Sequence, residues 1–184
     1  LNHSAGVYGD AAIAAMTVVQ RIMQFAASAM IGYGQGFQPV CGFNFGAKKY
    51  DRVKDGVKFC TKSSLLVLIA FSVIGIVFAP QLIAQFRDDP EVIAIGVRTL
   101  RFQCISFPLV GWIIISNMMA QTIGYTVRAS IMGMGRQFLF FVPCLYIMSA
   151  VMGLTGIEAS QMAADIIGFV VSLAIGIDIL KKMK

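Results

Sequence analysis

Two rows of polar side chains run along segments of the sequence that are otherwise apolar. The first row is Thr17, Gln20, Gln24, Ser28, Gln35 and Gln38, and the second is Thr99, Gln103, Ser106, Asn117 and Gln121. At about 100° per residue, the first row falls within an arc of roughly 80° and the second within roughly 60°. Ordinary hydrogen bonds between helices explain some of these groups, at about 0.6 kcal/mol each. The number of amide side chains that recur on one side of each helix favours two stripes that line one interior cavity.

Two charged side chains lie well inside the same apolar segments. Arg21 would be costly in lipid unless it were paired or lined water, which favours a structural or gating role. Asp165 lies eight residues beyond Ile157, roughly 12 Å along a helix at 1.5 Å per residue. A carboxyl at that depth is a candidate proton carrier. The alternative is a structural carboxylate that is bonded to Arg21 or to a neighbouring hydroxyl.

The composition shows which solvent these segments meet. Of the 184 residues, 58% are hydrophobic and 13% are charged, whereas a soluble domain averages 45–50% apolar and about 25% charged residues. The apolar residues fall into blocks of roughly 20, the length that spans ~30 Å of hydrocarbon as a helix. His3 is the only histidine, and the four cysteines form no C-x-x-C pair. These features argue against an enzyme, a metal site or a bound cofactor.

The blocks predict an all-α membrane protein with five transmembrane helices. Because lipid offers no partner for backbone groups, each block must satisfy its own hydrogen bonds as a helix. Gly32, Gly34, Gly36 and Pro39 are expected to interrupt the first helix, either as a hinge or as its natural end. The predicted spans are residues 11–37, 63–86, 92–124, 136–152 and 157–180.

The segments between the spans predict the orientation in the membrane. A basic loop at residues 44–62, a segment at residues 125–135 that contains Arg128 and is followed by Arg136, and the tail at residues 181–184 fall on one side. The acidic turn at residues 87–91 and the hairpin at residues 153–156 fall on the other. The excess of Lys and Arg makes the first side cytoplasmic, with the C-terminus inside and the first residues outside. Asp178, near the cytoplasmic end, is predicted to be interfacial. The charge pattern gives no indication of nucleic-acid binding.

The stretch from Gly32 to Lys54 resembles the multidrug and toxic compound extrusion (MATE) family, in the segment that joins its eighth and ninth spans. The resemblance is carried by Gln38-Pro39, Asn44, Gly46-Ala47 and Arg52-Val53-Lys54, followed in order by Phe86, Asp89, Arg101, Pro108, Gly135-Arg136-Gln137 and Pro143. It covers essentially the whole of residues 1–184. The sequence starts at Leu1 and runs directly into a helical pattern. It is therefore expected to be a C-terminal-half fragment, with most of the second six-helix bundle and without most of the seventh span.

The resemblance implies an antiporter of the bacterial inner membrane that exchanges protons or sodium ions for organic cations or drugs, in partnership with an N-terminal bundle. It places the first and third spans at the central cavity, and Asn44, Gly46, Ala47 and Arg52 in the cytoplasmic loop motif. Some branches of the family carry acidic coupling residues in the seventh and tenth spans, but residues 92–124 contain no carboxylate inside the span. The alternatives are a flippase of related fold for a lipid-linked substrate, and a membrane fragment that does not transport.

Overall fold

The computed structural model describes residues 10–183, apart from the side chains of Arg136 and Gln137. His3, the predicted location of the first residues and the contribution of the Arg136 side chain lie outside the described residues. Within them the chain is helical and contains no strand. The helices are α2 (Asp10–Gly46), α3 (Tyr50–Val77), α4 (Ala79–Ala84), α5 (Pro90–Thr122), α6 (Thr126–Met134), η2 (Gly135–Leu139), α7 (Phe141–Met152) and α8 (Leu154–Lys182).

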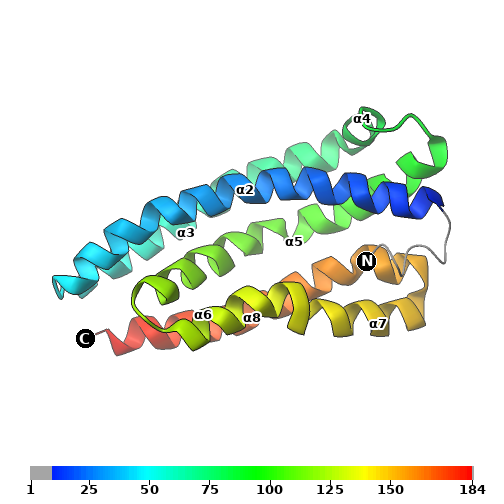
Figure 1. Ribbon diagram of the computed structural model, residues 1–184. Helices are drawn as coiled ribbons and strands as arrows, with labels where there is room; N and C mark the ends of the chain where they lie inside the picture. The colour runs from blue at the N-terminus through cyan, green and yellow to red at the C-terminus, as the bar shows by residue number, and fades with distance from the viewer. Residues whose placement is uncertain (1–9, 184) are drawn as a thin grey trace.

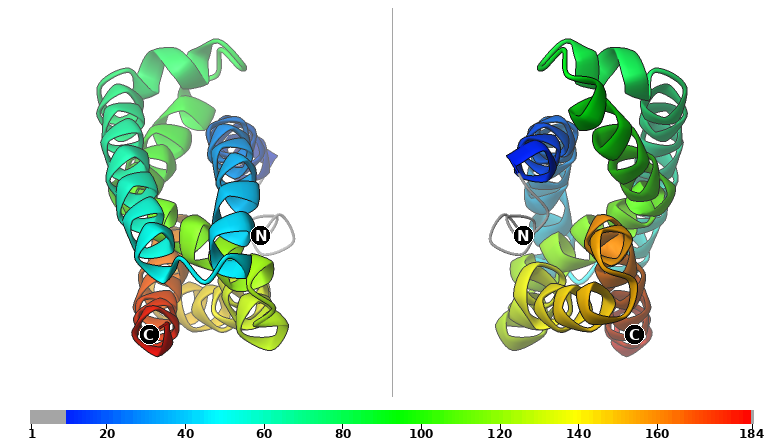
Figure 2. Two further views of the ribbon diagram at one scale, coloured as in Figure 1. Left: turned by 90° about the vertical axis from the view of Figure 1, so that its left-hand side faces the viewer. Right: turned by 90° about the vertical axis from the view of Figure 1, so that its right-hand side faces the viewer.

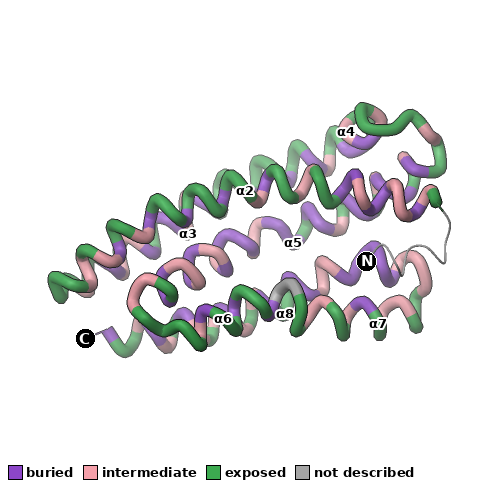
Figure 3. Tube along the Cα trace, in the orientation of Figure 1, coloured by how far each residue is buried: buried purple, intermediate pink, exposed green. Residues whose placement is uncertain are grey.

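The helices form a bundle around α5. Figure 1 shows α5 between a pair formed by α2 and α3 and a second group formed by α6, α7 and α8. The end views in Figure 2 show the same arrangement. Buried residues follow α5 along most of its length, whereas α3 has an exposed outer side (Figure 3). Helix α5 is therefore the common packing partner of the bundle.

Among residues 10–183, four helices are long and apolar enough to cross a membrane, namely α2, α3, α5 and α8. The fifth rod consists of α6, the π-helical turn η2 and α7, which follow one another in Figure 1. The predicted all-α membrane fold is confirmed. The rod begins at Thr126, so the prediction that residues 125–135 form a connecting segment is wrong.

The π-helical turn in the fifth rod has a local cause. Pro143 lacks a backbone N–H, and its ring would clash with the carbonyl of Leu139, four residues earlier. The helix widens immediately before this proline, and the Phe140 N–H bonds the Gly135 carbonyl five residues back, at 2.8 Å. Such widened turns occur in helices at functional sites more often than elsewhere.

Helix α2 runs past the predicted interruption and ends at Gly46 rather than at residue 37. Pro39 removes one backbone donor but does not stop the helix. Gly34 lies where α2 meets α5, and a Cβ there would come within 3.0 Å of Ile114 and 3.2 Å of Met118. Close packing of small residues stabilises helix pairs in a membrane, which offsets the low helix propensity of glycine. The predicted break in the first helix is therefore wrong.

The basic loop predicted at residues 44–62 is also shorter than expected. Helix α3 begins at Tyr50, so only residues 47–49 connect the two helices. The apolar side chains of Val53, Val57 and Cys60 recur at helical spacing and are buried. Charged residues lie between these apolar positions, and for this reason the sequence of the segment resembles a polar loop.

Lys48 closes the turn between α2 and α3 in a left-handed conformation, with φ 58°. The Lys48 N–H bonds the Phe45 carbonyl at 2.9 Å, and the Lys49 N–H bonds the Asn44 carbonyl at 2.9 Å. This pair of bonds is a Schellman motif, whose left-handed position usually holds glycine.

Replacing Lys48 with glycine is therefore expected to stabilise the protein. A residue with a side chain costs roughly 1–2 kcal/mol in the left-handed region, and glycine removes this cost. Glycine also raises the conformational entropy of the unfolded chain, which offsets part of the gain. The expected net gain in stability is about 0.5–1 kcal/mol. Thermal unfolding in detergent measures it. Lys49, with φ −87°, is the matched control, and Lys49→Gly should destabilise. Equal shifts for both variants would contradict the explanation.

Small residues bring the neighbouring helices close to α5. A Cβ on Gly75 of α3 would come within 2.6 Å of the Cys104 Sγ, and one on Gly176 of α8 within 2.9 Å of the Trp112 ring. Gly111 of α5 approaches Ser64 in the same way, at 2.7 Å. Packing of this kind is how helices associate in lipid, where there is no hydrophobic drive between them.

The connections fall at two ends of the bundle. The α2–α3 turn, the α5–α6 connection and the C-terminal end lie at one end in Figure 1, and α4 with the α7–α8 turn lies at the other. We name the first the basic end, since it carries Lys48, Lys49, Lys181 and Lys182. Its cytoplasmic location remains a prediction.

Candidate substrate pathway

Part of the polar stripe on α2 lines an open pocket of about 510 Å³. The residues around it are Thr17, Gln20, Arg21, Gln24, Phe25 and Ser28. Gln20, Arg21 and Gln24 are exposed, and Ser28 bonds back to the Gln24 carbonyl at 2.8 Å. An exposed arginine and amides inside a membrane-spanning helix need water or protein beside them rather than lipid.

The other predicted residues of α2 lie further along the helix, outside this pocket. Gln35 is exposed and Gln38 is half-buried, close to Pro39. Arg21 is with Gln20 and Gln24 in the pocket, whereas Asp165 is buried on α8. The structure therefore gathers the first half of the stripe and leaves the second half spread along the helix.

The stripe on α5 divides into two parts. Thr99, Gln103 and Ser106 are buried, because α5 is the central helix and its first half is covered on several sides. The Thr99 hydroxyl donates to the Ile95 carbonyl at 2.9 Å. Asn117 and Gln121 lie nearer the basic end. Asn117 is half-buried and Gln121 is exposed. Only this second part can meet a solute in the described structure.

Asn117 and Gln121 form one polar unit between α5 and α6. The Gln121 Nε2 donates to the Asn117 Oδ1 at 2.6 Å. Both amides line two adjoining pockets of about 550 and 190 Å³, together with Met132, Gly133, Met134 and Phe138 among others. A Cβ on Gly133 would come within 2.9 Å of the Asn117 Nδ2, so glycine keeps α6 close to this amide.

The two polar stripes do not meet in one described pocket. The smaller Asn117 pocket reaches α2 only through Ile31, whereas the α2 pocket contains no residue of α5. The sequence predicts a shared cavity. The structure instead presents two separate polar surfaces, one on α2 and one between α5 and α6.

Asp165 lies between α8 and α5, with 2% of its surface exposed. The Ser106 hydroxyl donates to one carboxylate oxygen at 3.2 Å, and the Gln161 amide donates to the other at 3.2 Å. The structure therefore contains the hydroxyl contact that the structural interpretation predicts. Together these groups form a buried polar link between the two helices.

Two ion pairs that join distant helices were not recognised in the sequence. Arg98 of α5 donates to Glu158 of α8 at 3.2 Å, and Glu158 is fully buried. Because Glu158 lies next to the predicted hairpin at residues 153–156, the sequence suggests a residue near the end of a span. The burial of Glu158 follows from the packing of α8 against α5 and α7, which only the structure shows.

The second pair lies at the basic end. Arg128 of α6 contacts Asp178 of α8 at 2.6 Å, and Lys182 contacts the same carboxylate at 3.0 Å. The Arg128 guanidinium also lies 5.1 Å from the centre of the Tyr125 ring. Asp178 is half-exposed, and it holds α6 against α8.

The residues of the loop motif lie around the α2–α3 turn. The Asn44 amide donates to the Val40 carbonyl at 2.8 Å, and Asn44 also accepts the backbone bond that closes the turn. Gly46 ends α2, while Ala47 and Arg52 are exposed. These contacts give the motif a structural part in shaping the turn.

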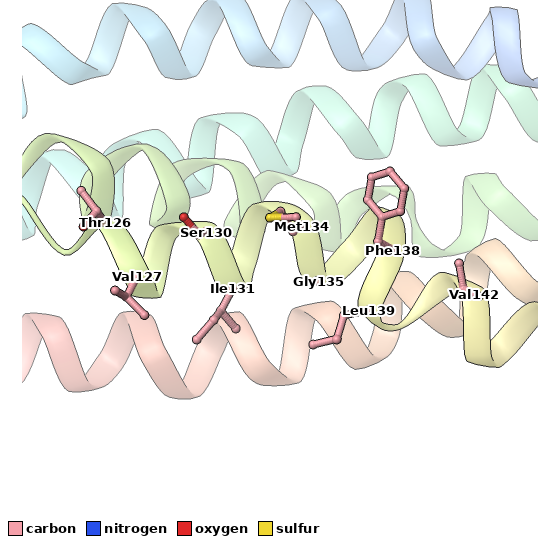
Figure 4. Close-up of a pocket in the computed structure, with 9 residues that line it drawn as sticks. All are labelled: Thr126, Val127, Ser130, Ile131, Met134, Gly135, Phe138, Leu139 and Val142. Atoms are coloured by element: carbon pink, nitrogen blue, oxygen red, sulfur yellow. The ribbon is translucent and has the colours of Figure 1, made fainter.

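An apolar pocket runs along α6, η2 and α7. It has a volume of about 670 Å³ and includes Val127, Ile131, Met134, Phe138, Leu139 and Val142. Figure 4 shows these side chains along one stretch of the fifth rod. In the described part of the chain, no group of three His, Cys, Asp or Glu residues is placed to hold a metal ion.

Comparison with known proteins gives consistent matches. The family model described as MatE matches residues 1–147. The multidrug export protein MepA of Staphylococcus haemolyticus is 26% identical over 165 residues, which is 90% of this chain and 36% of that protein. MepA of Staphylococcus saprophyticus is 29% identical over 167 residues, 91% of this chain and 37% of that protein. The chain thus spans little more than a third of the length of these relatives.

Solved structures have the same fold. The Vibrio cholerae MATE transporter VcmN in its bent form superposes with a TM-score of 0.91 at 23% identity, over 98% of this chain and 41% of that one. An outward-facing multidrug resistance MATE family transporter of the MOP superfamily gives 0.92 at 19% identity, over 99% of this chain and 42% of that one. At these identities the likeness concerns the fold alone.

Proposed function

The chain belongs to the MatE family, and from that membership we propose that it forms one helix bundle of an exporter that exchanges protons or sodium ions for organic cations. The family and the MepA relatives are transporters rather than enzymes. The relatives are longer than this chain, so the proposed transporter contains a further bundle beside this one. We place it in a bacterial inner membrane, with the basic end in the cytoplasm.

One observation carries the proposal, namely the difference between the outer surfaces of α2 and α3. Helix α2 exposes Gln20, Arg21 and Gln24 within a membrane-spanning segment. Helix α3 exposes Leu66, Ile69 and Val73 over a comparable stretch. A polar surface of this kind is stable only against water or a partner bundle, which supports α2 as a wall of the transport pathway.

An exporter of organic cations also needs a surface that binds flat cationic molecules. The pocket between α5 and α6 is suited to this. Asn117 and Gln121 offer amide oxygens and nitrogens to polar groups of a substrate. The thioethers of Met132 and Met134 adapt to different apolar shapes, and the ring of Phe138 can attract a cation through its face. We assign substrate contact to this pocket and to the α2 pocket.

Asp165 is the carboxyl that we assign to proton coupling. It is buried inside a membrane-spanning helix, and intramembrane carboxylates mark proton pathways in other transporters. Its contacts with Ser106 of α5 would transmit a change in protonation from α8 to the central helix.

The experiment on substrate contact uses the intact transporter that carries this chain, in cells deprived of their own exporters. The double variant Asn117→Leu/Gln121→Leu is expected to lower ethidium efflux about 25-fold. The reason is that it removes polar contacts worth about 1 kcal/mol each. Gln85→Ala, at an exposed position between α4 and α5, is the matched control and should retain efflux.

The amount of protein in the membrane is measured alongside transport. A double variant that is present at normal levels and exports ethidium like the parent would remove this pocket from the pathway. Absence of ethidium efflux by the unmodified transporter would contradict the export proposal itself.

A further inference from the structure

A stripe on the outer side of α3 changes from basic to apolar along the helix. At about 100° per residue its members fall within an arc of roughly 100°. We name it the α3 stripe; it consists of Lys58, Lys62, Leu65, Leu66, Ile69 and Val73. All six are exposed, with Leu66 73% exposed. Figure 2 shows α3 at the outside of the bundle.

The two lysines of the stripe have no carboxylate partner among the described residues. In contrast, Lys54 contacts Asp51 at 3.8 Å, and Lys182 contacts Asp178 at 3.0 Å. Asp55 lies one turn before Lys58 and forms no ion pair with it within 4.0 Å. The stripe therefore presents two positive charges that the folded chain leaves unneutralised, next to an apolar surface.

The apolar part of the stripe is unsuited to packing against another helix. Helix pairs in a membrane need small or polar residues at their contact. On α3 the small residues Ser64, Ser72 and Gly75 are buried toward the rest of the bundle, while Ala70 is exposed beside the stripe. The apolar part of the stripe consists of the branched side chains of Leu65, Leu66, Ile69 and Val73, which suit acyl chains.

The length of the stripe matches one leaflet of a bilayer. From Lys58 to Val73 the helix rises roughly 22 Å at 1.5 Å per residue. Half of a bilayer, headgroups included, measures about 20–22 Å. With the lysines at the depth of the headgroups, the apolar residues lie along the hydrocarbon of the same leaflet.

We propose that the α3 stripe is a binding site for an anionic phospholipid, whose phosphate contacts Lys58 and Lys62 and whose acyl chain lies along Leu65 to Val73. Charge complementarity selects the headgroup, because a zwitterionic lipid would bring no net negative charge to the two free ammonium groups. The site is separate from the pockets of the proposed transport pathway, so it does not depend on what is transported.

The test measures lipid binding by the intact transporter, reconstituted in phosphatidylcholine nanodiscs with a labelled phosphatidylglycerol as the probe. Each lysine near an anionic group contributes about 1 kcal/mol, or roughly fivefold in affinity. Lys58→Gln/Lys62→Gln is therefore expected to weaken binding about 25-fold. Lys54→Gln is the matched control, since Asp51 already partners that lysine, and it should change the affinity by less than about twofold.

A photo-crosslinking side chain at Leu66 identifies the occupant of the stripe directly. The proposal expects a crosslink to phosphatidylglycerol that is lost in the double lysine variant. Lys58 and Lys62 are exposed and Lys54 is half-buried. Equal thermal unfolding in pure phosphatidylcholine checks that the double lysine variant and Lys54→Gln are folded. Unchanged affinity in the double variant, or a crosslink from Leu66 to protein instead of lipid, would overturn the proposal.

Discussion

Gly156→Ala is expected to prevent the α7–α8 hairpin from closing and to leave little folded protein. A Cβ on Gly156 would overlap the carbonyl oxygen and carbon of Met148. These are backbone atoms, so no side-chain rotation relieves the overlap, and the two helices must separate. Overpacking typically costs 1–3 kcal/mol, and a backbone overlap this close should cost about 3 kcal/mol or more.

The loss would spread beyond the hairpin. Leu145 of α7 and Ile157 of α8 belong to the same buried cluster as Ala15 and Val19 of α2. Moving α7 away from α8 therefore also loosens contacts with the first helix. The yield of monodisperse protein in detergent and its thermal unfolding measure the effect.

Gly32→Ala is the matched control for this prediction. A Cβ at Gly32 meets no atom within 4 Å, and alanine favours a helix over glycine by up to about 1 kcal/mol. This variant should be as stable as the parent or slightly more stable. If both glycine variants behaved alike, the close helix crossing would not be what Gly156 provides.

Asp165→Asn is expected to abolish the pH dependence of efflux while the protein stays folded. Asparagine has nearly the same shape, and the Ser106 hydroxyl and Gln161 amide can each donate or accept, so the buried contacts can re-form. The side chain can no longer exchange a proton. Substrate efflux driven by a proton gradient should fall more than about tenfold, measured in vesicles at several external pH values, as expected for a lost proton-relay carboxyl.

Two further variants separate coupling from structure. Asp165→Ala leaves Ser106 and Gln161 without this partner and should cost about 1–3 kcal/mol of stability. Asp178→Asn removes a carboxylate at the basic end and should keep the pH dependence. An Asp165→Asn protein with the parental pH dependence would leave Asp165 with a purely structural role.

The fold was largely predictable because lipid imposes simple requirements. Uninterrupted apolar blocks must be helical when no water satisfies the backbone, and that reasoning predicted the all-α membrane fold. It failed where tertiary packing compensates a local signal. Gly34 and Pro39 indicate a break, yet contacts with α5 accompany a helix that continues to Gly46.

The site was less predictable than the fold. Helical periodicity places Gln103 and Asn117 on one side of α5 but cannot say what covers each part. The structure buries Gln103 and opens Asn117 to a pocket, since the neighbours of α5 differ along its length. The burial of Glu158 was not predicted for a related reason. It depends on how α8 packs after the turn between α7 and α8 at Gly153.

The Arg98–Glu158 pair also has a consequence for the order of assembly. The two residues are 60 positions apart, so Arg98 is synthesised well before its counter-charge. Arg98 keeps more than half of its side chain exposed, whereas Glu158 is fully buried. A buried carboxylate is costly without its partner, so α8 is expected to pack against α5 only where Arg98 is already in place. The first turns of α8 should thus settle after the central helix.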